Sequence, residues 1–377
     1  MKRTSLFPSL ALWLLSAAAA FGITSKPSEV TYIDSAGHQR IYAFACGNNG
    51  HLVVNYWDGF AWHWADQGLP AGSAAVSTPT AITYLSGGQQ RIYAFAQGAN
   101  FHLVVNYWDG FAWHWADQGL PAGVSAVYNP TAVTYVSGGN QRIYIFAQAS
   151  SGHLVVNYWD GFAWHWADQG LPSGSAGVYN ANAITYSNGT HQLIYVFAQA
   201  STGHLVVNYW DGFAWHWADQ GLPAGFTGVY SPSTITYAGG GHQLIYVFAQ
   251  GNNGHLAVNY WDGFAWHWAD QGLSAGTSAV YAPSAISYLS GGVQRIYVFA
   301  QASNFHLVVN YWDGIAWHWA DQGLPAGSAA VYYPSAITYA NSGGTQLIYV
   351  FGESNVNHLV VNYWTGSAWH WADQGNM

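Results

Sequence analysis

Short runs of alternating apolar and polar residues follow one another along the chain, and turns rich in glycine or aspartate interrupt them. Between positions 79 and 118, four such runs cover residues 79–85, 91–97, 102–108 and 112–118. Alternation with a period of two is typical of strands, and no run is long enough for three helical turns. The pair Asp109-Gly110 between the last two runs is a strong signal for a tight hairpin. The pattern predicts four antiparallel strands in this stretch.

The two faces of these predicted strands differ in the size of their side chains. In the last run, Trp113 and Trp115 share one face, whereas Ala112, His114 and Ala116 share the other. The second run is divided in the same way, with tyrosine and phenylalanine on one face and alanines on the other. Sheets of this kind can stack face to face in one sense, as the blades of a propeller do.

The four-strand unit is repeated along the chain. The segment from His51 to Gly68 recurs almost letter for letter, with copies that begin at His51, His102, His153, His204, His255, His306 and His358. An open solenoid would need polar capping units, but the terminal copies keep the apolar pattern, so the ring is expected to close. The prediction is an all-β fold, a seven-bladed β-propeller of four-stranded antiparallel blades over residues 21–377. Whether each first strand pairs within its own unit is left open.

The first twenty residues have a different character. Lys2 and Arg3 precede a short apolar stretch at 10–15, and three alanines at 18–20 offer a cleavage site. We therefore expect residues 1–20 to be a secretory signal peptide and the protein to be secreted. No other stretch reaches 18 apolar residues, so no membrane insertion is expected.

The amino-acid composition limits the kinds of molecule that the protein can be expected to bind. Only 6% of the residues are charged, against about 25% in an average globular protein. Aromatic residues make up 18%, which excludes a disordered chain, and 7 Lys and Arg against 16 Asp and Glu leave no basic surface for nucleic acid. The repeats hold 21 of the 22 tryptophans, so the aromatic excess is a property of the unit itself.

Two aspartates per repeat raise the hypothesis of a glycosidase, which needs a pair of carboxylates. Asp58, however, occupies a turn that favours aspartate for backbone reasons, and Thr365 replaces it in the seventh unit. Asp66 stands at a strand end, where a carboxylate can accept backbone N–H groups. Near-identical copies also leave few unique groups to form a catalytic site, so we expect no enzyme activity.

The other polar residues of the repeat do not indicate a cofactor. The two histidines per repeat lack metal-binding spacing and no calcium-loop pattern occurs, so we expect no metal and imidazoles that bind the backbone or a ligand. Arg91 is leucine in three other units, so its aliphatic stem is expected to pack. Cys46 is the only cysteine, which excludes an internal disulfide.

The tryptophans admit two interpretations. Most of them must fill space between blades. Indoles beside neutral hydrogen-bonding groups such as Asn55, His63 and Gln67 are also suited to sugars, whose apolar face stacks on the ring while their hydroxyls need fixed partners. Seven weak sites would gain strength by avidity on a multivalent target.

The run from Asn55 to Gly68, Asn-Tyr-Trp-Asp-Gly-x-x-Trp-x-Trp-Ala-Asp-Gln-Gly, resembles the repeat of the PLL-type lectins. These are seven-bladed propeller lectins, known chiefly from insect-associated bacteria, that bind L-fucose and O-methylated sugars in pockets between blades. The resemblance covers all seven units and implies a lectin without catalysis or a required metal. The seventh unit departs from it at Thr365 and Ser367, so its pocket is expected to differ or be lost.

We therefore predict a multivalent lectin whose partners are fucosylated or O-methylated glycans or glycoproteins, with a homo-oligomer left open. The alternative is a protein–protein interaction propeller that binds no sugar. The predicted carbohydrate-binding residues are one Asn, one His and one Trp of each repeat: Asn55, His63, Trp64, Asn106, His114, Trp115, Asn157, His165, Trp166, Asn208, His216, Trp217, Asn259, His267, Trp268, Asn310, His318, Trp319, Asn362, His370 and Trp371.

Overall fold

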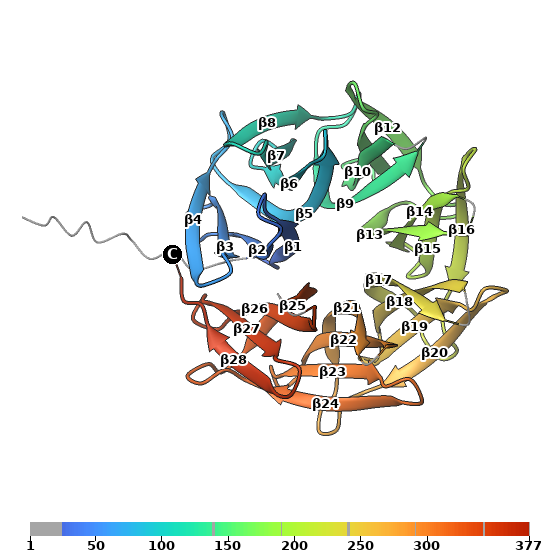
Figure 1. Cartoon of the computed structure of the whole chain (residues 1–377). Helices are drawn as coiled ribbons and strands as arrows, with labels where there is room; N and C mark the ends of the chain where they lie inside the picture. Colours follow the sequence, from blue (N-terminus) through green and yellow to red (C-terminus); the bar gives the residue numbers. More distant parts are fainter. Residues whose placement is uncertain are drawn as a thin grey trace, which may run out of the picture.

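The computed structural model describes residues 25–137, 140–189, 191–239, 242–290, 292–341 and 344–376, and the predicted signal peptide lies outside them. In these residues 28 strands form seven four-stranded antiparallel sheets. The sheets stand around a central opening, with the first strand of each innermost and the fourth at the perimeter (Figure 1). The predicted seven-bladed propeller is confirmed. Among the described residues, no helix is long and apolar enough to cross a membrane.

Each repeat forms one blade, and the first four blades have the following strands. Blade 1 contains β1 (Ser28–Ile33), β2 (Gln39–Cys46), β3 (Leu52–Trp57) and β4 (Trp62–Gly68). Blade 2 contains β5 (Val76–Ser86), β6 (Gln89–Gly98), β7 (Leu103–Trp108) and β8 (Trp113–Gly119). Blade 3 contains β9 (Val127–Ser137), β10 (Asn140–Ala149), β11 (Leu154–Trp159) and β12 (Trp164–Gly170). Blade 4 contains β13 (Val178–Ser187), β14 (Gln192–Ala200), β15 (Leu205–Trp210) and β16 (Trp215–Gly221).

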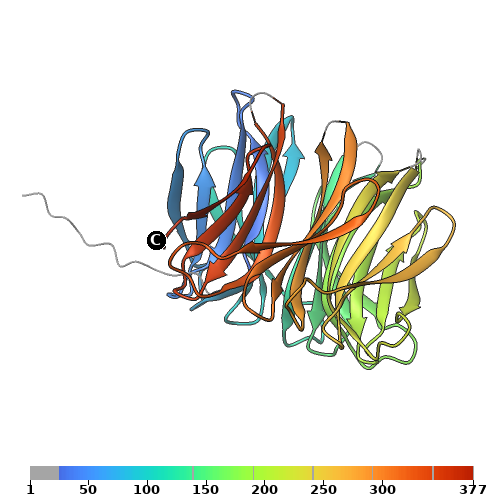
Figure 2. The ribbon, with the colours of Figure 1, turned by 90° about the horizontal axis from the view of Figure 1, so that it is seen from below.

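The last three blades repeat the pattern. Blade 5 contains β17 (Val229–Gly239), β18 (His242–Gly251), β19 (Leu256–Trp261) and β20 (Trp266–Gly272). Blade 6 contains β21 (Val280–Ser290), β22 (Val293–Ala302), β23 (Leu307–Trp312) and β24 (Trp317–Gly323). Blade 7 contains β25 (Val331–Ala340), β26 (Gln346–Ser354), β27 (Leu359–Trp364) and β28 (Trp369–Asp373). Their turns gather at the two ends of the ring (Figure 2).

The predicted runs of the second unit match the strands of blade 2, although β5 begins three residues earlier, at Val76, and contains a register shift between Ser77 and Thr80. The question left open by the repeat phase is settled, because every first strand pairs with the second strand of its own unit. No strand is therefore shared between blades, and the ring is held together by packing between their faces.

The interface between blades joins an aromatic face to a face of alanines and tryptophans. Phe44 is fully buried, and its ring meets that of Trp113 in the next blade edge-on, with centroids 5.8 Å apart. Ala94 and Ala96 of blade 2 belong to the same cluster, where their small side chains leave room for the ring. Burying one such phenylalanine stabilises the fold by about 2–3 kcal/mol, and each of the seven interfaces repeats it. The predicted division of the strand faces is confirmed.

A bulge at the end of the fourth strand in blades 1 to 6 adds a second link between blades. The register shifts between Leu52 and Val53, which places Gln67 outside the β3–β4 ladder, and Gly68 adopts a left-handed φ of 66°. A glycine is favoured there because other residues are strained at positive φ. The Gln67 carbonyl then accepts a hydrogen bond from the Trp115 indole N–H of blade 2 at 2.7 Å.

The ring closes between blades 7 and 1, which lie side by side at the two ends of the colour scale (Figure 1). Trp64 donates its indole N–H to the carbonyl of Gln374 at 2.9 Å, as its copies do at other interfaces. The Tyr339 hydroxyl donates to the carbonyl of Gln39 at 3.1 Å. Closure therefore uses the contacts of an ordinary blade interface.

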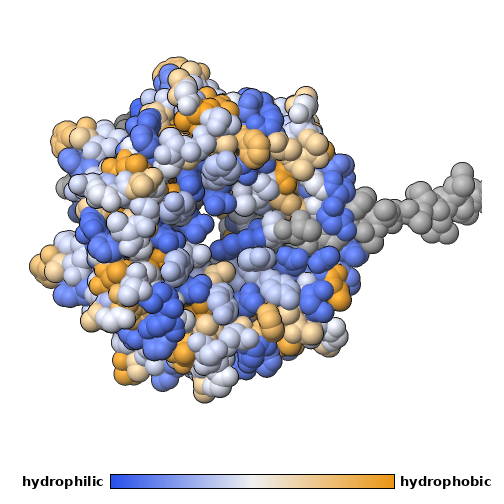
Figure 3. Space-filling view, turned by 180° about the vertical axis from the view of Figure 1, so that it is seen from behind, coloured by the Kyte–Doolittle hydropathy of each residue, from blue (hydrophilic) through white to orange (hydrophobic). Residues whose placement is uncertain are grey.

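The first strands surround a central channel of about 720 Å3 whose wall is mostly uncharged and polar. Side-chain oxygens of one blade accept backbone N–H groups of the next, for example Ala81 N–H to Ser28 Oγ at 2.9 Å. Hydrophilic residues border the opening on the face seen in Figure 3. At the closing interface the Ser335 hydroxyl donates instead to the Glu29 carboxylate at 2.6 Å.

Glu29 is specific to blade 1, since five of the other six blades have alanine at the equivalent position of the first strand and the sixth has threonine. Burial raises the pKa of Glu29 to about 7, against the opposing effects of the Ser335 hydrogen bond and of nearby Lys26. Its Oε1 is buried without a hydrogen-bond partner among the described residues. The ionised form is therefore poorly accommodated in the folded ring.

We predict that Glu29→Ala stabilises the protein at pH 8 but not at pH 4.5. Because the folded pKa lies above the unfolded one, the wild type is most stable, relative to the variant, below pH 4.5. That stability is lost as the pH rises from 4.5 through 7, by about 3 kcal/mol. Urea unfolding of both proteins between pH 4.5 and 8 measures it. A difference that does not change with pH would contradict the prediction. Burial also raises the pKa of Glu353 to about 7, but Glu353 is present in both proteins, so its titration cancels in the difference.

A second prediction concerns the link through Gln67. Trp115→Phe keeps an aromatic ring between blades 1 and 2 but removes the indole N–H, so it should lower the free energy of unfolding by about 1.5 kcal/mol. Phe111→Ser is the matched control, because Phe111 is 82% exposed in the same blade and Ser367 stands at that position in blade 7. Equal effects of the two substitutions in urea unfolding would show that the indole hydrogen bond contributes nothing.

Candidate functional site

A cavity of about 270 Å3 lies between blades 5 and 6, toward the perimeter of the ring. Blade 5 contributes residues of β18, β19 and β20, and blade 6 contributes the tryptophans that flank the β23–β24 turn. The lining consists of Tyr246, Val258, Tyr260, Ala269, Gln271, Trp312 and Trp317. The cavity is therefore mostly aromatic, with an amide and two phenols as its polar groups.

Strand pairing fixes the aromatic walls. Tyr246 and Tyr260 are cross-strand neighbours on β18 and β19, and their rings stack with centroids 5.5 Å apart at 13°. On the opposite wall Trp312 and Trp317 pair across the β23–β24 hairpin, with centroids 5.7 Å apart at 49°. Phe248 packs edge-on against Trp317 at 5.8 Å and belongs to the buried core of this interface. Both walls are held in place by the contacts that join the blades.

The phenol of Tyr246 stays protonated over the physiological pH range, because burial raises its pKa to about 12. A protonated phenol can both donate and accept a hydrogen bond. The cavity therefore offers neutral hydrogen-bonding groups between apolar walls.

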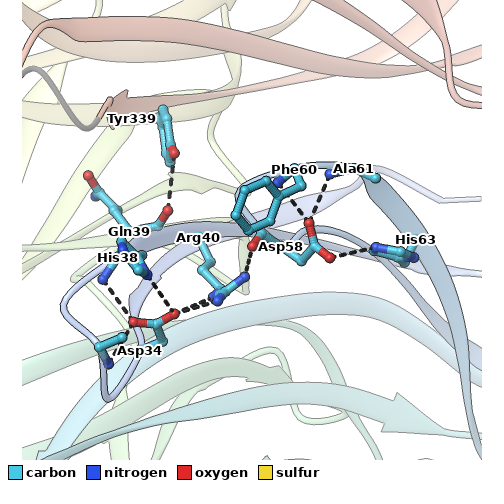
Figure 4. Close-up of polar contacts among 10 residues, drawn as sticks. Asp34, His38, Gln39, Arg40, Asp58, Phe60, Ala61, His63 and Tyr339 are labelled. Atoms are coloured by element: carbon cyan, nitrogen blue, oxygen red, sulfur yellow. Dashed lines mark hydrogen bonds and ion pairs between the residues drawn. The ribbon is translucent and has the colours of Figure 1, made fainter.

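A histidine and an aspartate extend this wall to the surface. The His267 ring lies 5.2 Å from that of Tyr260, and its Nε2 is 2.8 Å from Asp262 Oδ2. The other oxygen of Asp262 accepts the backbone N–H groups of Phe264 and Ala265, and these bonds lower the pKa of the carboxyl. Figure 4 shows the same turn in blade 1.

The turn role predicted for Asp58 is confirmed, since its Oδ1 accepts the N–H groups of Phe60 and Ala61 at 2.8 Å. These two bonds hold the pKa of Asp58 down at about 2. Asp66 likewise accepts the Gly68 N–H at 2.7 Å, and it also pairs with His51 at 2.8 Å. Sequence reasoning assigned the histidines to the backbone or to a ligand, whereas the structure pairs them with carboxylates of their own repeat, except His370 of blade 7, where Thr365 replaces the aspartate.

Asp58 lies in the turn that precedes β4 and Asp66 lies near the far end of that strand, so they do not face one another as a catalytic pair would. Among the described residues, no three His, Cys, Asp or Glu side chains gather where they could hold a metal ion.

The residue types of the cavity recur at every blade interface. The motif supplies the same Tyr, Val, Tyr, Ala and Gln from one blade and the same two Trp from the next, and the core clusters place these pairs together at each interface. The tyrosines are Tyr42, Tyr93, Tyr144, Tyr195, Tyr246, Tyr297 and Tyr349 of the second strands, and Tyr56, Tyr107, Tyr158, Tyr209, Tyr260, Tyr311 and Tyr363 of the third strands.

The three residue positions predicted to bind sugar are not brought together. Asn55 is 1% exposed and donates its amide to the His63 carbonyl at 3.4 Å, on the face shared with Trp64. Trp64 also faces the preceding blade, where its indole N–H donates a hydrogen bond to the Gln374 carbonyl. The His63 side chain lies on the opposite face, beside Tyr56. A sugar-binding role for the Asn and Trp series stays a prediction, and of the three only the histidine lies next to a cavity-lining residue.

The sequence did not identify the tyrosines that line the cavity, nor the two tryptophans on either side of the Asp-Gly turn, as candidate site residues. Trp57 and Trp62 stand at either end of the Asp-Gly turn and pair with each other, which the hairpin signal could have indicated. The tyrosines share a face with Phe44 in the alternating pattern. That face was expected to pack, and it does so at its inner end, while its outer end lines the cavity.

No family model and no curated protein matches the sequence. Among solved structures, the lectin BP39L from Burkholderia pseudomallei is similar with a TM-score of 0.68 at 21% identity, over 94% of this chain and 99% of that one. AofleA from Arthrobotrys oligospora has a TM-score of 0.56 at 15% identity, over 94% and 88%. The six-bladed fungal lectin from Aleuria aurantia, described with a novel fucose recognition mode, has a TM-score of 0.51 at 19% identity, over 78% and 95%. The resemblance to propeller lectins is thus confirmed as a likeness of fold.

Proposed function

We propose that this protein is a non-enzymatic, multivalent lectin that binds fucosylated or O-methylated glycans in the cavities between its blades. The observation that carries the proposal is the cavity between blades 5 and 6, whose two tyrosines, two tryptophans and one glutamine recur at the equivalent positions of all seven interfaces.

The chemistry of the cavity suits a single sugar ring. Indole and phenol rings provide flat apolar surfaces for the C–H face of a pyranose, and the neutral phenol and amide groups can bind its hydroxyls. The volume of about 270 Å3 lies just below the range of drug-sized sites, roughly 300–1,000 Å3. Val258 and Ala269 form an apolar floor, which favours a sugar with a methyl group such as fucose or an O-methyl ether.

Two of the similar structures support this substrate class. SapL1 lectin is described in complex with alpha methyl fucoside, and the Aleuria aurantia lectin with alpha-methyl-L-fucoside. For the present protein, seven weak sites on one ring would act together on a surface with many glycans, where linkage raises the effective affinity without new contacts. The proposed setting is extracellular, as the expected signal peptide at residues 1–20 implies.

One observation favours the alternative, a propeller that binds another protein. Five phenylalanines and an isoleucine project from the turns between third and fourth strands, with 82% to 91% of their side chains exposed. Exposed apolar side chains that recur around one end of the ring can together form a docking surface for a partner. In that case binding of the partner would not be affected by free sugar or by deglycosylation.

Calorimetric titration with methyl α-L-fucoside and with an O-methylated monosaccharide tests the lectin proposal. Replacing the third-strand tyrosines with phenylalanine keeps the stacked rings and removes only one hydroxyl per cavity, so affinity should fall about fivefold at an unchanged melting temperature. The variant carries Tyr→Phe at Tyr56, Tyr107, Tyr158, Tyr209, Tyr260, Tyr311 and Tyr363.

The control is Tyr→Phe at five tyrosines of the first strands, outside the cavity: Tyr128, Tyr179, Tyr230, Tyr281 and Tyr332. It should bind as the wild type does. Absence of binding by the wild type at millimolar concentrations of both sugars would overturn the proposed function.

A further inference from the structure

The second strands differ in one residue beside the cavity. Four blades have arginine there, Arg40, Arg91, Arg142 and Arg295, and three have leucine, Leu193, Leu244 and Leu347. The residue lies two positions before the stacked tyrosine and therefore on the same face of the strand. In blade 5, Leu244 accordingly precedes Tyr246 of the cavity, at the end nearest the turn between β19 and β20.

In blade 1 the arginine already has a counter-ion within the protein. The guanidinium of Arg40 forms an ion pair with Asp34, and it also donates to the backbone carbonyl of Asp58 (Figure 4). Asp34 is supplied only by blade 1, because the same position is serine in the other blades with arginine: Ser86, Ser137 and Ser290.

The other three arginines have no such counter-ion. Within the part of the chain that the structure describes, no carboxylate lies within 4.0 Å of Arg91, Arg142 or Arg295, while Arg40 has one. The Nε atom of each is buried without a hydrogen-bond partner. The side chains are partly buried, and Arg91 lies close enough to the Tyr93 phenol to affect its titration.

The aspartate of the neighbouring turn does not neutralise these arginines. In blade 2, Asp109 Oδ1 accepts the N–H groups of Phe111 and Ala112, and Oδ2 pairs with His114 at 2.9 Å. Arg91 is absent from the groups that lower the pKa of Asp109. A partly desolvated guanidinium without a counter-ion lowers the stability of the ring. An anionic ligand whose oxygens accept several hydrogen bonds would offset that cost.

We propose that the cavities flanked by Arg91, Arg142 and Arg295 bind sugars that carry an anionic group, a carboxylate or a sulfate ester, whereas the other four cavities bind neutral sugars. The assignment rests on the proposed lectin function and divides its seven sites into two classes. A planar guanidinium favours a charged oxygen group over a hydroxyl, because charge-assisted hydrogen bonds are about twice as strong as neutral ones.

Three probes that share one ring test the proposal by calorimetry: methyl α-L-fucoside, its 3-O-sulfate, and the methyl glycoside of L-galacturonate, which carries a carboxylate in place of the fucose methyl group. The wild type should bind one of the anionic probes at three sites, at least about tenfold more tightly than the neutral probe. Raising the salt concentration should weaken only the anionic binding. The sulfate and the carboxylate probes distinguish the two sources of charge.

The main variant converts the three arginines to the residue of blades 4, 5 and 7: Arg91→Leu, Arg142→Leu and Arg295→Leu. Because leucine already fits this position elsewhere in the ring and the substitution removes partly desolvated charges, the variant should fold with a melting temperature equal to or above that of the wild type. It should lose the anionic preference and keep its affinity for the neutral fucoside. The corresponding Arg→Lys variant keeps the charge without the guanidinium geometry and should retain part of the preference.

Two results would overturn the inference. If the neutral fucoside binds but neither anionic probe binds more tightly, the lectin function stands and the two-class assignment fails. The same holds if the Arg→Leu variant keeps the full anionic preference. If the wild type binds none of the three probes at millimolar concentration, the proposed function and this inference fail together.

Discussion

The whole ring depends on the unequal faces of the blade. One face carries large rings such as Phe44, and the other carries alanines and the tryptophans of the fourth strand. A single blade cannot bury both of its faces by itself. Because the two faces complement each other, another copy of the same blade fits against either of them. Repetition of one sequence thus produces a closed structure without a strand shared between first and last blades.

The same inequality creates the cavity. Near the channel, phenylalanine rings meet alanines that leave room for them, so the inner part of each interface is fully packed. Farther out, the tyrosines of one blade face the tryptophans at the turn of the next, and between blades 5 and 6 these four rings enclose space. The bulge at Gln271 and the hydrogen bond from the Trp319 indole to the Gln271 carbonyl fix the spacing of these two blades at this radius. The walls of the site are therefore rigid for the same reason that the ring is stable.

The fold could be predicted from the sequence because its information is local and repeated. The alternation of large and small residues, the Asp-Gly turn and the copies beginning at His51 define the strands, the blade and its number. The site could not be predicted in the same way, because the three tryptophans of a repeat look alike in sequence. Their roles diverge through register: Trp317 borders the turn and lines the cavity, while Trp319 donates its indole N–H to the Gln271 carbonyl of the preceding blade. The pairing of His51 with Asp66 likewise depends on the bulge, which a periodic pattern does not reveal.

Packing also determines where the seven units can differ. Residues that join two blades, such as Phe44 and its copies, must fit a neighbour on the other side, so a change in one blade would need a matching change in the next. The position two residues before the stacked tyrosine of the second strand has no such restraint. Four blades have arginine there and three have leucine, while the tyrosine itself is the same in all seven. Asp34 forms an ion pair with the arginine of blade 1 only. The charge beside the cavities therefore differs between blades, although the aromatic residues that line them are the same. A ring built from copies of one unit can therefore diversify its sites through the residues that its packing leaves free.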